Sequence, residues 1–272
     1  MVSGPVLTTG ANSGIGLATA IELARRGFDS VGSVRSAAKA RAVRSAAREA
    51  GVEVRTVILD VGDPERCRQV VDRVRPYAIV NNAGFGAVGA IEDVSDEDAH
   101  AAFETMVFAP IRLARLALPH MRSHGGGRIV NLSSIYGLTT TPLSGWYQGA
   151  KHALEGLSDA LRMEVAGDGV KVILIEPGGF DTGIWEDARS EVARRPRSRY
   201  QGAYGRLQAG VRLSRPLMGH PRQVAKVIAG AISSSRPRAR YLVGADAQAI
   251  AFWGRLLPTE LKDRLTRLTL GL

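Results

Sequence analysis

The sequence has almost no cysteine: Cys67 is the only one in 272 residues. A single thiol excludes an internal disulfide, and its neighbours offer no metal-ligand spacing, so we expect a passive thiol and no metal site. Apolar runs of transmembrane length are also missing. A predicted strand starts within a few residues of Met1, which leaves no room for a secretory signal. We therefore expect a reduced, soluble, cytoplasmic protein.

Acidic residues are scarce in one segment. The chain has a net charge of +10, and between Arg189 and Arg222 nine arginines accompany a single acid, Glu191. No nucleic-acid-binding motif accompanies these arginines, so we expect no nucleic-acid partner. Two interpretations stay open, a solvated surface or a contact with an anionic substrate, partner or membrane.

Strand-like and helix-like segments alternate from Val6 to about Val243, with no repeat and no low-complexity linker. Some strands are unbroken apolar runs, such as 173–175, which suit strands covered on both faces. The pattern predicts one α/β domain over residues 1–272, a doubly wound, Rossmann-type parallel sheet flanked by helices on both faces. We expect later strands at 31–34, 52–59, 78–80, 128–132, 170–175 and 241–243. We expect helices at 15–26, 37–50, 64–74, from 95 towards 120, 146–165 and 221–234.

Two segments depart from this alternation. Residues 179–220 are long, basic and weakly periodic, which predicts a substrate loop with short helices. After the last strand, residues 247–270 predict an amphipathic C-terminal helix with an apolar stripe at Leu261, Leu265 and Leu268. That stripe could pack on its own domain, on a second subunit, or at a membrane surface.

The first strand ends in a glycine-rich turn. Gly10, Gly14 and Gly16 allow a sharp bend and a close approach of the backbone to a ligand, just where a helix begins. The first amides of a helix lack internal partners and carry partial positive charge, so the turn predicts a phosphate cradle. The alternative is an ordinary strand-turn-helix in which the glycines serve only the bend.

A phenol and an ammonium group lie four residues apart at Tyr147 and Lys151, hence on one helix face. We expect the ammonium to lower the pKa of the tyrosine and so make it a usable general acid or base. Ser134 ends a predicted strand beside this helix, and its hydroxyl could bind a substrate carbonyl oxygen. The alternatives are a surface pair and two serines, Ser133 and Ser134, that merely end a strand.

Several motifs together resemble the short-chain dehydrogenase/reductase family. In chain order they are Thr9-Gly10-x-x-x-Gly14-Ile15-Gly16, Asn82-Ala83-Gly84, Ser134, Tyr147-x-x-x-Lys151 and Pro177-Gly178. The resemblance implies an enzyme in which Tyr147 is the acid/base, Ser134 orients the carbonyl, and Lys151 lowers the tyrosine pKa and binds the nicotinamide ribose. It also implies a homo-oligomer.

The same resemblance implies the cofactor-binding residues. Asp60 and Val61 match the adenine-contacting pair, and Pro177, Gly178 and Thr182 match the segment at the nicotinamide. The full implied set is Gly10, Asn12, Ser13, Gly14, Ile15, Gly16, Arg35, Asp60, Val61, Asn82, Ala83, Gly84, Tyr147, Lys151, Pro177, Gly178 and Thr182.

The second strand ends in Ser33-Val34-Arg35, with no acid to bind a ribose 2′-hydroxyl. A guanidinium at this place suits a 2′-phosphate, so NADP, as NADPH, is expected rather than NAD. The alternative is an arginine that only stacks on the adenine.

One position departs from the family pattern. Met106 aligns where the family usually has an asparagine that holds a water of a proton relay, and a thioether is a weak acceptor and no donor. We expect activity to persist, either slowed or with a backbone group and water in the relay.

Apolar residues near the expected site predict a pocket for a bulky lipophilic ketone or secondary alcohol, although core packing could use the same side chains. They are Tyr136, Leu138, Leu143, Trp146, Phe180, Ile184 and Trp185. The phrases at 111–119 and 176–178 look most like the steroid- and retinol-dehydrogenase-like branch. Two alternatives stay open: a 3-oxoacyl carrier-protein reductase that docks its carrier on the basic segment, and a non-catalytic NADP-binding regulator.

Overall fold

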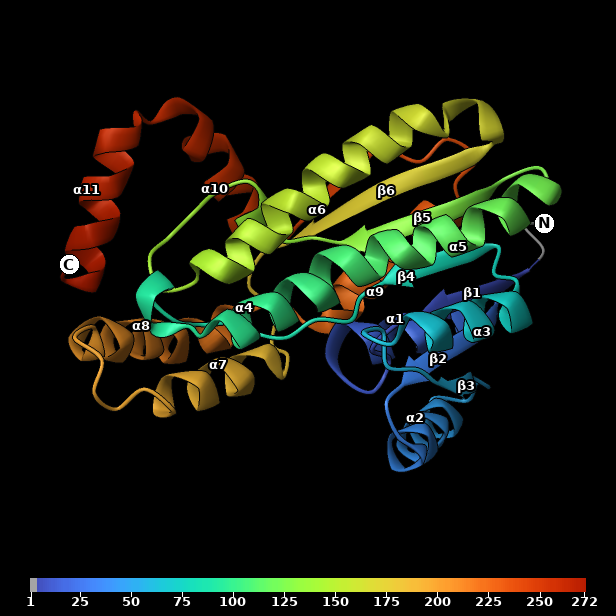
Figure 1. Cartoon of the computed structure of the whole chain (residues 1–272), viewed down its shortest axis with the longest axis horizontal. Coiled ribbons are helices and arrows are strands. Elements are labelled where there is room, and N and C mark those ends of the chain that lie inside the picture. The colour runs from blue at the N-terminus through green and yellow to red at the C-terminus, as the bar shows by residue number, and fades with distance from the viewer. Residues whose placement is uncertain (1–3) are drawn as a thin grey trace.

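The computed structural model describes residues 4–272, and a parallel sheet runs through the centre of this part of the chain (Figure 1). Across the described residues its strand order is β3-β2-β1-β4-β5-β6-β7, and each neighbouring pair is parallel. The strands are β1 (Pro5–Thr8), β2 (Asp29–Val34), β3 (Arg55–Ile58), β4 (Ala78–Asn81), β5 (Gly127–Leu132), β6 (Val170–Pro177) and β7 (Arg240–Val243). The order reverses between β1 and β4, which confirms the doubly wound sheet expected from the sequence.

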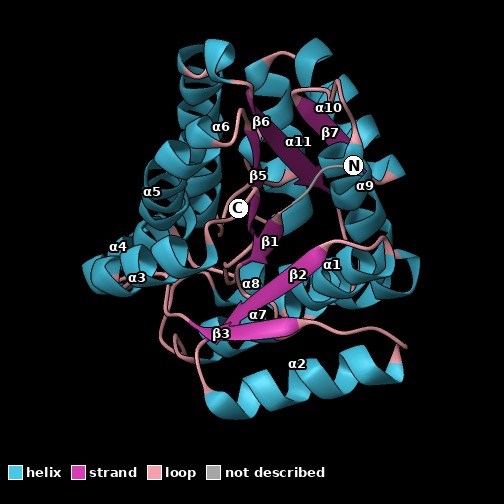
Figure 2. Ribbon diagram, turned by 90° about the vertical axis from the view of Figure 1, so that its right-hand side faces the viewer, coloured by secondary structure: helices cyan, strands magenta, loops and turns pink. Residues whose placement is uncertain are grey.

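Helices cover both faces of the sheet (Figure 2). One face carries α1 (Gly14–Arg25), α2 (Ala37–Glu49) and α9 (Pro221–Ser233). The other carries α3 (Pro64–Val74), α5 (Ala109–Ser123) and α6 (Gly145–Glu164). Because both faces are covered, strand residues that point either way are buried, which explains the unbroken apolar runs.

Alternate residues of each strand serve the two cores. Ile79 and Ile129 pack with α5, whereas Val80 and Val130 pack with α9 around Ile228. Each such side chain, fully buried, contributes roughly 1.5–3 kcal/mol relative to exposure. The central strands therefore form a rigid base whose C-terminal ends carry the functional loops.

Side-chain caps fix the starts of α3 and of a further helix, α4 (Asp96–Phe103). The Asp63 carboxylate accepts the amide of Arg66 (3.0 Å), and Pro64 occupies the first turn of α3. The Ser95 hydroxyl accepts the amide of Asp98 (3.2 Å) and opens α4. These local signals are readable because each depends on residues within one helical turn.

The helix expected to run from 95 towards 120 is interrupted. A π-helical turn, η2 (Glu104–Phe108), separates α4 from α5. Pro110 has no amide hydrogen, so it cannot donate to the carbonyl of Met106 in an α-helical ladder. The wider π turn accommodates the missing bond and buries Met106 and Val107.

The 179–220 segment is more helical than its weak periodicity predicts. It forms α7 (Ile184–Ala193) and α8 (Gln201–Ser214), followed by the short turn η5 (Arg215–Leu217). Tyr204 anchors α8 to the loop after β4: its buried hydroxyl accepts the amide of Ala90 (2.7 Å) and donates to the carboxylate of Asp93 (2.7 Å). Few other residues of these helices are buried, which explains the weak hydrophobic pattern.

The prediction of one helix over 247–270 is wrong. The chain forms two helices, α10 (Ala245–Leu256) and α11 (Thr259–Leu270), which Figure 1 shows in red. Pro258 causes the break, because the residue before a proline is driven out of the helical region and Leu257 is extended. The leucine stripe at 261, 265 and 268 lies on α11 and is exposed. Within residues 4–272 no helix is long and apolar enough to span a bilayer.

Candidate active site

A cavity of about 460 Å³ opens at the C-terminal ends of the strands. Loops after β1, β2, β3, β4, β5 and β6 meet there, as expected for a doubly wound sheet. Every catalytic and cofactor-binding residue expected from the sequence lines this one cavity. These residues are Gly10, Asn12, Ser13, Gly14, Ile15, Gly16, Arg35, Asp60, Val61, Asn82, Ala83, Gly84, Ser134, Tyr147, Lys151, Pro177, Gly178 and Thr182.

The glycine-rich turn forms a tight cradle. Gly10 and Gly14 have positive φ angles of 64° and 52°, a region that favours glycine. A Cβ at Gly16 would clash with the carbonyl oxygen of Gly10 and the side-chain amide of Asn82. The start of α1 has no side-chain cap. Its first amides are therefore suited to an anionic group, and the turn fits a dinucleotide pyrophosphate.

The Asn82 side chain stabilises this cradle by hydrogen bonding to the turn itself. Its side-chain amide donates to the carbonyl of Thr9 (2.8 Å), while the Thr9 hydroxyl accepts the amides of Asn82 and Ala83 (both 3.0 Å). The turn after β1 and the loop after β4 are thus joined by side-chain to backbone hydrogen bonds.

The end of β2 brings two cations to the cavity. Arg35 lies at its exposed edge, and Lys39, which the sequence analysis missed, is half-buried in the first turn of α2. Among the described lining residues the only carboxylates are Asp60 and Asp187. Asp60 follows β3 and accepts the amide of Gly62 (3.0 Å). No lining carboxylate therefore comes from the end of β2.

Cys67 lies just behind this end of the cavity. Its side chain is fully buried in α3 and its thiol donates to the carbonyl of Val61 (3.4 Å). Burial raises the pKa of this thiol, so it stays protonated and inert, as the sequence suggests.

Ser134, Tyr147 and Lys151 converge on the opposite wall. Ser134 ends the loop after β5, where its hydroxyl accepts the amide of Tyr136 (3.2 Å) and opens the short turn η3 (Ile135–Gly137). The amine of Lys151 lies 5.6 Å from the centre of the Tyr147 ring and donates to the carbonyl of Leu132 (2.7 Å). A hydroxyl, a phenol and an amine thus lie at one end of the sheet.

The expected lowering of the tyrosine pKa is not found. Burial raises the pKa of Tyr147 to about 12, only partly offset by hydrogen bonding with Ser134. Burial also lowers the pKa of Lys151 to about 8, against the opposing charge of Glu155. The sequence-based expectation fails because the helix spacing shows proximity but not desolvation. At neutral pH the phenol is protonated and can donate a proton.

Met106 lies beside these groups. It is buried, it lines the cavity, and it packs with Ala150 and Tyr147 in a small apolar cluster. Its sulfur would lie 3.6 Å from a Cβ placed on Gly84. No side-chain hydrogen-bond donor is therefore supplied at this position.

The remaining wall is mainly apolar, and it differs from the prediction. Phe180, Ile184 and Trp185 line it as expected, together with Tyr136. Leu138, Leu143 and Trp146 lie outside the lining, because Leu143 packs against Tyr204 and Trp146 stacks edge-on against Phe103. The additional apolar lining residues are Phe85, Ala87, Val88 and Ala188. The apolar run directly after Asn82-Ala83-Gly84 was the available signal for the first three.

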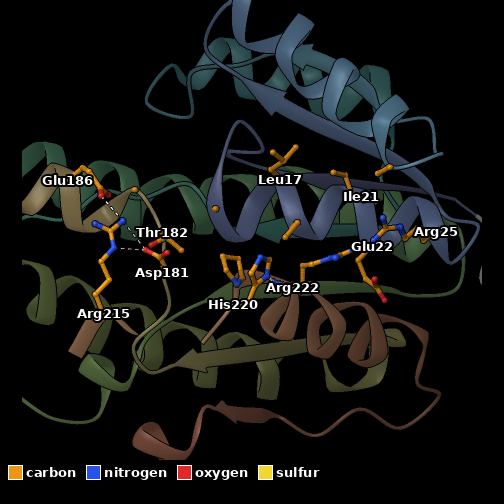
Figure 3. Close-up of a pocket in the computed structure, with 15 residues that line it drawn as sticks. Leu17, Ile21, Glu22, Arg25, Asp181, Thr182, Glu186, Arg215, His220 and Arg222 are labelled. Carbon is orange, nitrogen blue, oxygen red and sulfur yellow. Dashed lines mark hydrogen bonds and ion pairs between the residues drawn. The ribbon is translucent and has the colours of Figure 1, made fainter. Parts of the chain in front are cut away.

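A second hollow of about 560 Å³ lies on the outer side of α1, towards the start of α9 (Figure 3). It shares only Gly14, Thr182 and Gly183 with the first cavity. At one end Arg215 pairs with Asp181 (3.0 Å) and Glu186 (2.9 Å). This hollow contains none of the hydroxyl-phenol-amine group and only Gly14 of the glycine cradle.

Fold and site define a nucleotide-binding oxidoreductase of the Rossmann type, with a phosphate cradle and a proton donor at one end of a parallel sheet. Residues 5–193 match the family model described as short chain dehydrogenase. The chain belongs to the short-chain dehydrogenase/reductase family, whose members bind NAD or NADP.

Proteins of similar sequence align with most of this chain. An uncharacterized oxidoreductase of Bacillus subtilis, YusZ, is 38% identical over 230 residues, which is 82% of each protein. YbbO of Escherichia coli, also an uncharacterized oxidoreductase, is 34% identical over 96% of this chain and 93% of its own length. The 3-ketodihydrosphingosine reductase of Bacteroides thetaiotaomicron is 30% identical over 90% of this chain and 89% of its own.

Solved structures share the fold. A short-chain dehydrogenase from Streptomyces avermitilis superposes with a TM-score of 0.78 at 30% identity, covering 97% of this chain and 95% of that one. An actinorhodin polyketide ketoreductase with NADPH gives 0.77 at 28% identity, covering 90% and 96%. The comparisons support the family assignment and do not single out the steroid- and retinol-dehydrogenase-like branch.

Proposed function

We propose that this protein is an NADP(H)-dependent oxidoreductase that interconverts a ketone and a secondary alcohol on a bulky lipophilic substrate. The observation that carries the proposal is the single cavity that joins the glycine cradle, the group of Ser134, Tyr147 and Lys151, and an apolar wall. A steroid or retinoid is one substrate class of suitable size and polarity, and a long-chain ketone is another.

NADPH, when bound, supplies the hydride for reduction. The Tyr147 phenol, whose pKa burial raises to about 12, holds the proton that the reduced oxygen receives. Ser134 orients the carbonyl oxygen by donating a hydrogen bond to it. Lys151, fixed by its bond to Leu132, contributes positive charge that stabilises the phenolate left after proton transfer.

Two cations support NADP over NAD. Arg35 and Lys39 line the cavity at the end of β2, and a 2′-phosphate placed there gains charge-assisted hydrogen bonds from both. A carboxylate that would bind a free 2′-hydroxyl is missing from the described lining at this end. The polyketide ketoreductase with a similar fold was solved with NADPH.

The apolar wall supports a lipophilic substrate. Phe85 and Val88 come from the loop after β4, Ile184 and Trp185 come from the start of α7, and all four line one space. The relative named as a 3-ketodihydrosphingosine reductase acts, by that name, on a ketone of a lipid. The carrier-protein alternative is less well supported, because Arg194, Arg195 and Arg215 of the basic segment already pair with acids of this chain.

A substrate screen tests the proposal. Steroid, retinoid, long-chain and small polar ketones would be offered with NADPH or NADH, and oxidation of the cofactor followed by absorbance. We expect turnover of at least one lipophilic ketone, with NADPH preferred. Success with polar ketones alone would refute the lipophilic pocket. Tight NADPH binding without any reduction would favour the non-catalytic regulator.

The cofactor preference has its own test. Arg35→Ala is expected to weaken NADPH binding by roughly 10-fold to 100-fold, as for loss of a charge-assisted hydrogen bond, and to leave NADH binding nearly unchanged. Arg41→Ala, on the helix α2 that follows Arg35 but outside the cavity lining, is the matched control. Equal weakening of both cofactors by Arg35→Ala would show that the arginine only stacks on the adenine.

A further inference from the structure

A cluster of charged side chains is buried directly behind the active site. Glu155 of α6 and Glu176 of β6 are 5% and 1% exposed. Arg240 of β7 joins them: its guanidinium lies 3.1 Å from a carboxylate oxygen of Glu155 and 3.2 Å from one of Glu176. It also pairs with the more exposed Asp159 (2.6 Å). Burying two carboxylates with one guanidinium is costly, so the cluster calls for an explanation.

Glu155 lies where it can act on the catalytic group. Tyr147, Lys151 and Glu155 follow one another at intervals of four residues on α6, so they occupy one face of the helix. The amine of Lys151 is buried, and Glu155 is the carboxylate that acts on it electrostatically.

Glu155 also packs against the loop that carries Ser134. A Cβ added to Gly137 would lie 2.7 Å from the hydroxyl oxygen of Ser133 and 3.0 Å from Cγ of Glu155. The hydroxyl of Ser133 and the carboxylate therefore share the small space under η3. Neither the Ser133 hydroxyl nor one oxygen of Glu155 has a hydrogen-bond partner among the described residues.

The electrostatics of the cluster agree with this placement. Burial and the neighbouring Glu155 raise the pKa of Glu176 to about 7, and burial raises the pKa of Glu155 as well, while Arg240 lowers both. Around Lys151 the other ionisable groups are neutral phenols, those of Tyr147 and Tyr136. Glu155 is thus the charge that raises the pKa of the buried amine and opposes the effect of burial.

We propose that Glu155 is a positioning residue of the active site, which holds Lys151 in its charged form and braces the end of β5 under Ser134. Arg240 and Glu176 keep the Glu155 side chain in place. The inference rests on the proposed function for its catalytic consequence, but the effect on Lys151 can be measured without any substrate.

Lysine NMR provides that measurement. The chain has five lysines, so a protein labelled at lysine Cε gives few signals, and Lys151→Met identifies the buried one. In the wild type we expect this amine to titrate near pH 8. In Glu155→Gln its midpoint should fall by about one pH unit, a tenfold change in the ratio of charged to neutral amine, since the opposite charge is lost.

Asp159→Asn is the matched control. Asp159 is on the same helix and pairs with the same arginine, but it does not act on Lys151. In Asp159→Asn the titration midpoint of Lys151 should match that of the wild type. In Glu155→Asp, which keeps the negative charge, the midpoint should fall less than in Glu155→Gln. If Glu155→Gln fails to fold, Glu155→Asp must still show a smaller fall. Equal midpoints in all variants would overturn the proposal and leave the cluster a purely structural one.

The catalytic consequence follows from the sign of the shift. Lys151 is charged below its pKa, so ketone reduction should decline above about pH 8 in the wild type and about one unit lower in Glu155→Gln. Asp159→Asn should keep the wild-type pH profile. If the wild type reduces no ketone, the proposed function fails, while the NMR midpoints still decide the role of Glu155.

Discussion

The two walls of the cavity are built in different ways. The cofactor wall is fixed by backbone geometry: Gly16 packs against the carbonyl of Gly10, and Thr9 and Asn82 join two loops through short hydrogen bonds. The substrate wall is formed by the loop after β4 and the start of α7, and surface ion pairs are among the contacts that hold α7, such as Arg215 with Asp181 and Glu186.

This difference predicts that the cofactor wall tolerates fewer substitutions than the substrate wall. A close backbone approach accepts only glycine at its tightest points, so the cofactor wall tolerates few changes. Surface ion pairs between exposed side chains contribute about 0–1 kcal/mol each, so the exposed charged residues of α7 can be exchanged at little cost. We therefore expect substitutions at the two walls to have separable effects.

The largest effect is expected at the point where the walls meet. Tyr147→Phe removes the proton donor and should lower kcat by roughly 10²-fold to 10⁴-fold, with NADPH binding nearly unchanged. Tyr136→Phe is the matched control, because its ring packs edge-on against Tyr147 in the same cavity. A loss as large in Tyr136→Phe would show that the proton comes from elsewhere.

Paired glycine substitutions sharpen the comparison directly. In Gly16→Ala the new methyl group meets backbone, so we expect a loss of about 3 kcal/mol or more in unfolding free energy, as for overpacking, and loss of NADPH binding. Gly205→Ala, in α8, meets nothing within 4 Å and should stabilise the protein by about 0.5–1 kcal/mol. Urea denaturation measures both, and equal costs would show that the close approach at Gly16 does not constrain the cofactor wall.

The substrate wall should affect specificity and not the cofactor. Trp185→Ala enlarges the cavity and should lower kcat/KM for a bulky ketone by about 10-fold to 200-fold, less for a small one. The KM for NADPH should stay at its wild-type value. Because the indole also donates to the carbonyl of Phe180 (2.8 Å), Trp185→Phe separates the loss of that bond from the loss of volume.

The smallest effect concerns the proton relay. Met106→Asn restores a side-chain donor and acceptor beside Tyr147 and should raise kcat modestly under saturating cofactor. The buried site is apolar, so this variant should also lose about 1–3 kcal/mol of stability. Met106→Leu is the control and should leave kcat unchanged. No gain in Met106→Asn would count against the relay account.

The cofactor wall could be predicted from the sequence because its constraints are local. Gly10, Gly14 and Asn82 occupy fixed places after strands, and the strand order brings those places together. The substrate wall could be predicted only in part. Trp146 and Leu143 are as apolar as Trp185, but Trp146 packs on Phe103 of α4 and Leu143 on Tyr204 of α8, and the sequence does not show these contacts.

Other differences arise from effects that spacing does not show. The separation of Tyr147 and Lys151 predicts contact correctly, but the burial that controls both pKa values depends on the loops after β4 and β5. The break at Pro258 was visible in the sequence, since a proline within a helical pattern ends it. The π turn before Pro110 follows from the same missing amide.

The buried thiol of Cys67 can be used to measure local opening of the structure. The chain has one thiol, which donates a hydrogen bond to the carbonyl of Val61 beneath the proposed adenine subsite. An alkylating reagent can reach this thiol only when α3 and the end of β3 move apart. The rate of labelling therefore measures how often α3 opens away from the end of β3, and a nucleotide bound above the thiol should slow the reaction.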